Sequence, residues 1–192
     1  MTPLRDRLFQ QPWPEGEFRF FQLGFVVDDL LQVAERWTRV QGVGPFHVFP
    51  RVAADCTYRG APSKLDLQIA VAQAGPVQIE LIQQYGDGPS VYRDWLRQGA
   101  SHAFHQICTV TQDYDGKRSH YESLGYELAS EMKAGSGRIA FYDTVRDFGF
   151  FTEVAESSPS FLANLAKVAR TCAAWDGSDP VRLITRDGYR TP

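Results

Sequence analysis

Two stretches of the chain share one pattern of apolar and polar positions. Residues 19–30 read RFFQLGFVVDDL, and residues 103–114 read AFHQICTVTQDY. Each run has the aromatic and β-branched composition of a strand and then reaches an aspartate, where a helix can begin. Gln22 and Gln106 occupy equivalent positions in the two runs. The pattern therefore predicts the same strand-to-helix corner twice.

A second matched pair of strands closes each half of the chain. The run VQIELI, residues 77–82, places Glu80 in the middle of a predicted strand. The run GFFTEV, residues 149–154, does the same for Glu153. The chain reads as two copies of one unit, each opening with a strand that carries glutamine and closing with a strand that carries glutamate.

The spacing of apolar residues predicts the remaining elements. Alternating positions indicate strands, whereas a spacing of three and four residues indicates helices. After each opening strand we expect a helix, over residues 29–40 and about 114–124, and then further strands, so that each unit has the order β-α-β-β-β. A short helix is expected over residues 90–96, and an amphipathic one over 159–175. Strands are expected at residues 19–27, 47–51, 56–59, 65–73, 77–82, 103–111, 126–132, 138–143 and 149–155.

These elements predict an α+β fold with five segments. We expect an N-terminal arm over residues 1–18, a first module over 19–84, a linker with a short helix over 85–101, a second module over 102–156, and a C-terminal helix with a polar tail over 157–192. The two modules can pair within one chain or across the two chains of a homodimer, and the sequence leaves both arrangements open.

Composition narrows the class of protein. The 192 residues are 43% hydrophobic and 13% aromatic, which is enough to bury a core and excludes a disordered chain. The net charge of -3 and the lack of a run of Lys or Arg argue against nucleic acid as a partner. No segment has the length and apolarity of a membrane span or a secretion signal, so we expect no membrane partner.

The cysteines indicate a reducing compartment. Cys56, Cys108 and Cys172 are odd in number and lack the spacing of a zinc ribbon, which argues against a disulfide framework. We therefore expect a cytoplasmic protein.

The repeated glutamines and glutamates are the candidates for chemistry. Side chains alternate between the two faces of a strand, so these polar residues are set among apolar neighbours. A buried carboxylate without a partner costs roughly several kcal/mol, and no Lys or Arg occupies the matching strand positions. If the two units pair into one curved sheet, the four positions converge. A divalent cation bound by two carboxylates and two amide oxygens would then compensate their burial.

The motifs FFQLGFVVDDL, GVGPF, VQIELIQ, FHQICTVTQDYD and the closing YDT…GFFTEV carry a resemblance over about residues 20–156. They resemble the vicinal oxygen chelate superfamily, which includes glyoxalase I, methylmalonyl-CoA epimerase, extradiol dioxygenases and bleomycin-resistance proteins. Their order is most similar to the glyoxalase and epimerase branch. The resemblance implies two βαβββ modules that pair into a curved mixed sheet with a central cleft. It also implies one metal ion held by Gln22, Glu80, Gln106 and Glu153.

The resemblance further implies an activity. A metal-dependent isomerase, epimerase or lyase would act on a small molecule with vicinal oxygens by removing the proton next to a carbonyl. Glu153 is the candidate base and Glu80 its partner. Family members commonly have histidine where this chain has Gln22 and Gln106, which shifts the expected preference among Mg, Mn, Co, Ni and Zn toward the first three. The alternative is a metal-free binding protein of the bleomycin-resistance type, with aromatic residues around its ligand.

Further residues are candidates for lining the cleft and binding the substrate. Aromatic strand residues either line a cleft or pack in a core, and the pattern does not separate these roles. His105 would take the place of Gln106 if the strand slipped by one residue, but that slip would turn the apolar set of the strand outward. The candidate substrate-binding residues are Phe46, Phe49, Tyr58, His105 and Tyr142.

Overall fold

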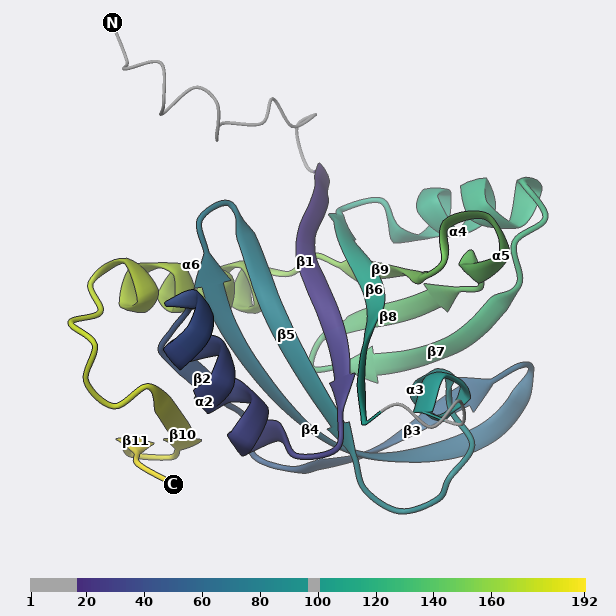
Figure 1. The fold of residues 1–192 in the computed structure, drawn as a ribbon. Helices are drawn as coiled ribbons and strands as arrows, with labels where there is room; N and C mark the ends of the chain where they lie inside the picture. Colours follow the sequence, from purple (N-terminus) through teal and green to yellow (C-terminus); the bar gives the residue numbers. More distant parts are fainter. Residues whose placement is uncertain (1–16, 97–100) are drawn as a thin grey trace, which may run out of the picture.

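The computed structural model describes residues 17–96 and 101–192 (Figure 1). The predicted N-terminal arm, up to residue 16, and residues 97–100 of the predicted linker lie outside the described residues.

The first module contains one helix and a run of strands. Its elements are β1 (Glu17–Val27), α2 (Leu30–Gln41), β2 (Phe46–Val48), β3 (Val52–Tyr58), β4 (Ala61–Ala74) and β5 (Val77–Gln84). The helix begins where the side chain of Asp29 accepts a hydrogen bond from the backbone N–H of Gln32 at 3.0 Å. It ends at Gly42, whose φ of 67° is left-handed and favours glycine.

The second module follows a similar order, with three strands after its first helix where the first module has four, and with α5 before its last strand. Its elements are β6 (His102–Thr111), α4 (Tyr114–Ser123), β7 (Leu128–Ala134), β8 (Gly137–Tyr142), α5 (Val145–Phe148) and β9 (Phe151–Glu156). Asp113 accepts a hydrogen bond from the backbone N–H of Gly116 at 2.9 Å, as Asp29 does in the first module. The linker carries α3 (Val91–Leu96), and α6 (Pro159–Ala173) follows the second module.

The modules pair within one chain. β1 lies parallel to β5 and antiparallel to β6, and β3 lies antiparallel to β7. Because β4 also pairs with β5, the order β1-β5-β4-β3-β7-β8-β9-β6 closes on itself. The prediction of two βαβββ modules in one curved mixed sheet is confirmed (Figure 1).

Apolar residues divide between the inside of this ring and its outer faces. On β1, Leu23 and Phe25 face outward toward α2, while Val26 belongs to the interior. Two residues of α3, Val91 and Tyr92, also pack into the interior and are 0% and 3% exposed. The linker helix therefore fills one end of the ring.

The C-terminal segment differs from the prediction. The expected polar tail from Asp176 instead forms β10 (Val181–Thr185) and β11 (Gly188–Arg190). β10 lies parallel to β2, and Val181 is buried in the cluster beneath α2. Its partner strand is distant in the sequence, so the local pattern gave no signal for this strand.

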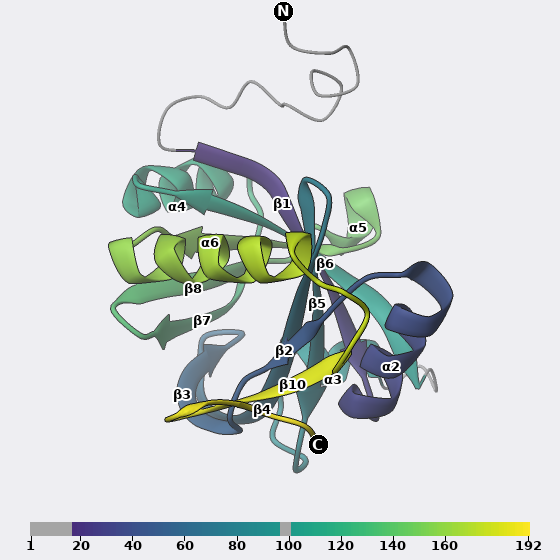
Figure 2. The ribbon, with the colours of Figure 1, turned by 90° about the vertical axis from the view of Figure 1, so that its left-hand side faces the viewer.

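α6 crosses from one module to the other (Figure 2). Near its start, Phe161 packs against Cys108 and Ala155 of the second module. Near its end, the thiol of Cys172 accepts a hydrogen bond from the backbone N–H of Gln73 in β4 at 3.2 Å. α6 therefore contacts strands of both modules, the second module near its start and β4 of the first module near its end.

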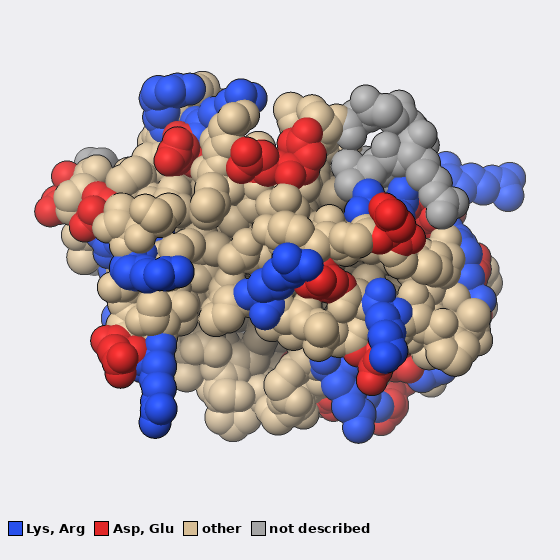
Figure 3. All heavy atoms as spheres, turned by 90° about the horizontal axis from the view of Figure 1, so that it is seen from below, with Lys and Arg blue, Asp and Glu red and all other residues tan. Residues whose placement is uncertain are grey.

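Among the described residues, no helix combines the length and the apolarity that crossing a membrane requires. On the face seen in Figure 3, basic and acidic side chains are interspersed.

The buried layer between α2 and the sheet is expected to be a main source of stability. Leu81 is 0% exposed there, so Leu81→Ala should lower the free energy of unfolding by about 2–5 kcal/mol through the cavity it leaves. Val40 provides the control, because it lies on α2 but is 69% exposed. Val40→Ala should change the free energy of unfolding by no more than about 0.5 kcal/mol. Urea unfolding measures both, and equal effects would contradict the assignment of this layer.

Candidate functional site

The candidate site is built around a glycine in β1. Gly24 lies opposite Glu80 on β5 and opposite Gln106 on β6. A Cβ atom at Gly24 would lie 2.4 Å from Cδ of Gln106, closer than two such atoms can approach. The side chain of Gln106 therefore lies across β1 in the space that glycine leaves, and this brings its amide within reach of β5.

Gln106 joins two carboxylates from the two modules. Its Nε2 donates hydrogen bonds to Oε2 of Glu80 and to Oε2 of Glu153, each at 3.0 Å. Gln106, Glu153 and Glu80 are only 1%, 5% and 8% exposed. The structure thus brings three of the four predicted metal ligands into direct contact, although they come from three strands.

Gln22, the fourth predicted ligand, lies on the same interior face but has another partner. It is 6% exposed, and its Nε2 donates to Oε1 of Gln78 at 2.9 Å. Gln78 lies opposite Gln22 in β5, whereas the equivalent position opposite Gln106 in β9 is Phe151. Gln22 therefore has an amide partner within its own module, and Gln106 has none there. Gln78 was not among the predicted site residues, although it precedes Glu80 by two positions and so shares its face.

Burial of the two carboxylates changes their acidity. Burial, followed by the negative charge of Glu153, raises the pKa of Glu80 well above its usual range, against the opposing hydrogen bond from Gln106. Burial also raises the pKa of Glu153 to about 7, and the hydrogen bond from Gln106 again opposes the shift. Two like charges in one buried site resist ionising together, so the pair retains a proton near neutral pH.

His105 enters the interior beside Gln106 through a β-bulge. The register passes from Gly24 opposite Gln106 to Phe25 opposite Phe104, which leaves His105 without an opposite residue on β1. His105 is 0% exposed, and its ring stacks on Phe151 with centroids 4.9 Å apart. From the sequence, His105 and Gln106 are expected to be alternatives separated by a strand slip. The bulge instead turns both side chains inward without moving the rest of the strand.

The imidazole of His105 has a partner at each nitrogen. Nδ1 contacts Oε1 of Gln106 at very short range, and Nε2 lies 3.1 Å from the carbonyl oxygen of Val91 in α3. Burial lowers the pKa of His105 to about 4, against the opposing hydrogen bonds from Gln106 and Val91, so the ring is neutral at pH 7.

The predicted aromatic substrate-binding residues lie in several different places. Tyr58 belongs to the interior, where its hydroxyl donates to Asp94 of α3 at 2.7 Å. Phe46 is buried in the outer layer beneath α2, and Tyr142 stacks on Tyr121 beneath α4 with centroids 4.7 Å apart. Phe49 borders a cavity of about 330 Å³ beside the C-terminal hairpin. These residues therefore do not form one aromatic wall around the glutamates.

Tyr92 is an interior aromatic residue that sequence analysis did not identify. Its ring centroid lies 5.1 Å from that of His105 and 5.6 Å from that of Phe141. Burial, followed by the charges of Glu153 and Glu80, raises the pKa of its phenol. Tyr92 comes from the linker helix, outside the repeat, so the comparison of the two halves gave no signal for it.

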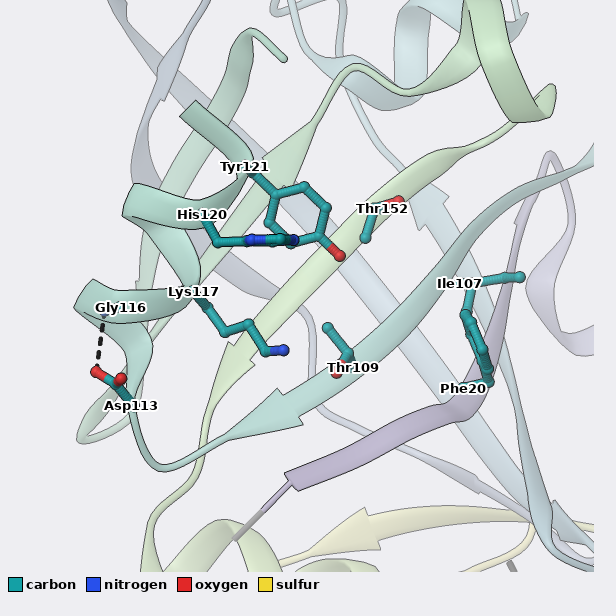
Figure 4. A pocket seen from close by; sticks show the side chains of 9 residues that line it. All are labelled: Phe20, Ile107, Thr109, Asp113, Gly116, Lys117, His120, Tyr121 and Thr152. Atoms are coloured by element: carbon teal, nitrogen blue, oxygen red, sulfur yellow. Dashed lines mark hydrogen bonds between the residues drawn. The ribbon is translucent and has the colours of Figure 1, made fainter. Parts of the chain in front are cut away.

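One cavity lies outside the ring (Figure 4). It measures about 610 Å³ and is formed where α4 passes over the outer faces of β6 and β9. Lys117, His120 and Tyr121 extend from the helix over Thr109 and Thr152 on these strands. None of the four predicted ligands lines it, so this cavity is separate from the interior site.

The interior donor set fits a hard divalent cation. In the described part of the chain, no group of three or more His, Cys, Asp or Glu side chains could hold a metal ion. The donors here are two carboxylates and the amides of Gln106 and Gln22. No Lys or Arg among the described residues acts on the pKa of either glutamate. Two carboxylates that lack a cationic partner, together with two amide side chains, supply oxygen ligands of the type that Mg²⁺ and Mn²⁺ prefer.

The chain matches known proteins in sequence pattern and in fold. The family model of the Glyoxalase/Bleomycin resistance protein/Dioxygenase superfamily matches residues 21–142. Methylmalonyl-CoA epimerase from Mycobacterium tuberculosis superposes with a TM-score of 0.54 at 17% identity, over 81% of this chain and 99% of that one. A hypothetical protein from Bacillus halodurans C-125 gives 0.53 at 14% identity, over 75% and 96%. A methylmalonyl-CoA epimerase variant from Streptomyces coelicolor, in complex with 2-nitronate-propionyl-CoA, gives 0.50 at 20% identity, over 73% and 95%. No curated protein matches the sequence.

The raised pKa of Glu153 predicts a pH-dependent stability. The folded protein keeps this proton from pH 4.5, the usual pKa of glutamic acid, up to about 7, whereas the unfolded chain releases it at 4.5. The carboxyl group therefore lowers the stability of the ion-free protein progressively as pH rises through that window. Glu153→Gln removes this titration. The free energy of unfolding of the variant, relative to that of wild type, should therefore rise by on the order of 3 kcal/mol between pH 4.5 and 8.

Urea unfolding in EDTA at a series of pH values measures this difference. Glu156→Gln serves as the control, because Glu156 lies on the same strand but its carboxylate pairs with Arg138 at 2.9 Å. A constant difference between Glu153→Gln and wild type over the whole range would contradict the raised pKa.

Proposed function

The chain belongs to the glyoxalase/bleomycin resistance/dioxygenase superfamily, and on that premise we propose that it is a divalent-cation-dependent isomerase, epimerase or lyase. Its substrate would be a small molecule with vicinal oxygens, such as a 2-hydroxy or 2-keto acyl compound or its thioester. The observation that carries the proposal is the pair of buried carboxylates, Glu80 and Glu153. Both accept a hydrogen bond from the same amide nitrogen, and among the described residues neither has a cationic side chain as a partner.

A cation would relieve the cost of burying this pair. Glu80, Glu153 and the amide oxygens of Gln106 and Gln22 would hold it. The nitrogen of Gln22 is already engaged by Gln78, which leaves its oxygen as the atom for a cation. A divalent ion bound there supplies Lewis acidity toward a substrate carbonyl. The donors are all oxygens, which favours Mg²⁺, Mn²⁺ or Co²⁺ over Ni²⁺ or Zn²⁺.

The protein's own part in the reaction is the movement of a proton. In the ion-free protein, burial raises the pKa of Glu153 to about 7, and a bound cation would oppose that rise. Glu153 would take the proton from the carbon next to the carbonyl. Glu80, on the opposite side of Gln106, would return a proton in an isomerisation or epimerisation. The apolar surroundings exclude water from the deprotonated carbon and so limit side reactions.

The structural neighbours support the proposal only in that enzymes of this reaction class share the fold. Methylmalonyl-CoA epimerases share this architecture with the chain at 17% and 20% identity. Their substrate is not carried over, because fold likeness at this identity speaks for the architecture and not for the ligand. A ligand-binding protein without a metal would need an aromatic pocket around the interior site. Phe46 and Tyr142 face other layers, whereas Tyr58, Tyr92 and Phe151 do belong to the interior, so the binding of a cation is the observation that separates the two functions.

The binding of Mn²⁺ tests the site directly. Mn²⁺ alone should raise the melting temperature of the wild-type protein, since an ion at 100 times its Kd stabilises the folded state by about 2.7 kcal/mol. Glu80→Gln and Glu153→Gln should each abolish most of this shift, whereas Glu156→Gln should keep it. Calorimetry gives the stoichiometry, expected to be one ion per chain. A shift of equal size in all four proteins would place the ion elsewhere.

Exchange of the substrate proton tests the chemistry. In D₂O, the Mn²⁺-loaded protein should introduce deuterium next to the carbonyl of its 2-hydroxy or 2-keto acyl substrate, measured by mass spectrometry across a panel of acids and thioesters. Glu153→Gln should slow this exchange by roughly 10²–10⁴-fold, the usual contribution of a general base. Equal exchange by wild type and variant would remove Glu153 from the reaction.

A further inference from the structure

The cavity beneath α4 lies where the first module has a packed apolar layer. In the first module, Phe25, Val33, Trp37 and Ile79 belong to one apolar cluster beneath α2. The alignment that places Gln22 on Gln106 and the registers of the two strand pairs give the corresponding residues of the second module, which are Thr109, Lys117, Tyr121 and Thr152. Three apolar positions of the first module are therefore polar or charged in the second.

This exchange of side chains opens the space. In the first module, the ring centroid of Trp37 lies 5.3 Å from that of Phe25 on β1. In the second module, Tyr121 stacks instead on Tyr142 of β8, at a centroid distance of 4.7 Å, and the position of Phe25 is taken by the smaller Thr109. The resulting cavity of about 610 Å³ has the size of a small-molecule site, for which about 300–1,000 Å³ is usual.

A bulge in β1 supplies an aromatic ring to one wall of this cavity. Before Gln22, β1 has three residues where β6 has only Thr109. Phe20 lies in this bulge with a left-handed φ of 54°, which is uncommon for a bulky side chain. The bulge turns Phe21 toward Phe161 and leaves the ring of Phe20 exposed at the cavity. Backbone strain of this kind tends to gather at ligand sites.

The helix and the strands supply polar groups around the same space. An ammonium, an imidazole, a phenol and two hydroxyls border it, from Lys117, His120, Tyr121, Thr109 and Thr152 (Figure 4). Lys117 is half-buried, and its side chain extends from α4 across the cavity toward Thr109 (Figure 4). Among the described residues that line the cavity, the only acidic one is Asp113, whose carboxylate accepts a hydrogen bond from the backbone N–H of Gly116 at the start of α4.

We propose that this cavity is a second ligand site, which binds a small organic anion with its carboxylate or phosphate group on Lys117 and its apolar body against Phe20 and Ile107. The ammonium favours an anionic head group through charge-assisted hydrogen bonds. The phenyl ring and the aliphatic side chain favour an apolar body. This inference is independent of the proposed function, because none of these residues belongs to the interior site.

NMR titration of the ¹⁵N-labelled full-length protein tests the site with two probes. In EDTA, 3-phenylpropionate and phenyl phosphate present the two head groups on a phenyl ring. The backbone amide signals of Thr109, Lys117 and Thr152 should shift, and the probe with the lower Kd identifies the preferred head group. The neutral 3-phenylpropionamide should bind at least about tenfold more weakly than the carboxylate, because it lacks the charge.

Three variants locate the probe. Lys117→Met keeps the length of the side chain but removes its charge, so it should weaken both anions by at least about tenfold and remove the difference between carboxylate and amide. Lys133→Met is the matched control, because Lys133 is exposed on β7 outside the cavity, and it should change each Kd by no more than about twofold. Thr109→Phe introduces the ring that Phe25 supplies in the first module, and by filling the cavity it should abolish binding.

The outcomes decide the inference without reference to the interior ion. Equal binding of carboxylate and amide, or unchanged binding by Lys117→Met, would overturn the anion site. So would the absence of shifts at the cavity amides with each probe at about 10 mM, where ligands of this size are expected to bind. Glu153→Gln should bind the probes as wild type does, and a loss there would move them to the interior. If Thr109→Phe folds poorly, the comparison of Lys117→Met with Lys133→Met still decides.

Discussion

The site depends on two glutamates that are buried close together and share one amide. Glu80 and Glu153 come from opposite halves of the chain, and each accepts a hydrogen bond from the same nitrogen of Gln106. Burying two carboxylates without a cationic partner costs free energy, which appears as their raised pKa values. The rest of the fold must hold the strands rigidly enough to keep them together. The closed order of strands does so, because neither half can move away without breaking the β1–β6 and β3–β7 pairings.

The duplicated fold produces an asymmetric site because two small positions differ. Gly24 follows Gln22 by two residues, and Cys108 follows Gln106 by two. In the sheet, Gln106 lies opposite Gly24, while Gln22 lies opposite Cys108. Gln106 can cross the bare glycine, whereas the residue opposite Gln22, Cys108, carries a side chain. One amide therefore spans both glutamates, and its counterpart turns to Gln78 within its own module.

The sequence predicted the fold and the positions of the candidate site better than the contacts within that site. Repeated glutamines and glutamates gave Gln22, Glu80, Gln106 and Glu153, because alternation along a strand fixes which face each residue takes. Which of them touch depends on the registers between strands distant in the chain, and on the size of the residue opposite, which no local pattern contains. The bulge at His105 is of the same kind, since only the pairing with β1 shows that one residue is left over. The β10 strand likewise forms through a distant partner.

The elements outside the repeat close the site and thereby restrict what it can accept. α3 fills one end of the ring with Val91 and Tyr92, and α6 packs Phe161 against Cys108, which lies opposite Glu153 in the sheet. The two carboxylates are 5% and 8% exposed. α3 is bound to the ring by the Tyr58–Asp94 hydrogen bond and by the contact of Val91 with His105. The start of α6 is held by the packing of Phe161, whose ring centroid lies 6.2 Å from that of Phe21. In the proposed function, the repeat would supply the acid and base groups and α3 and α6 the enclosure, and substrate choice would then fall to the segments that the two modules do not share.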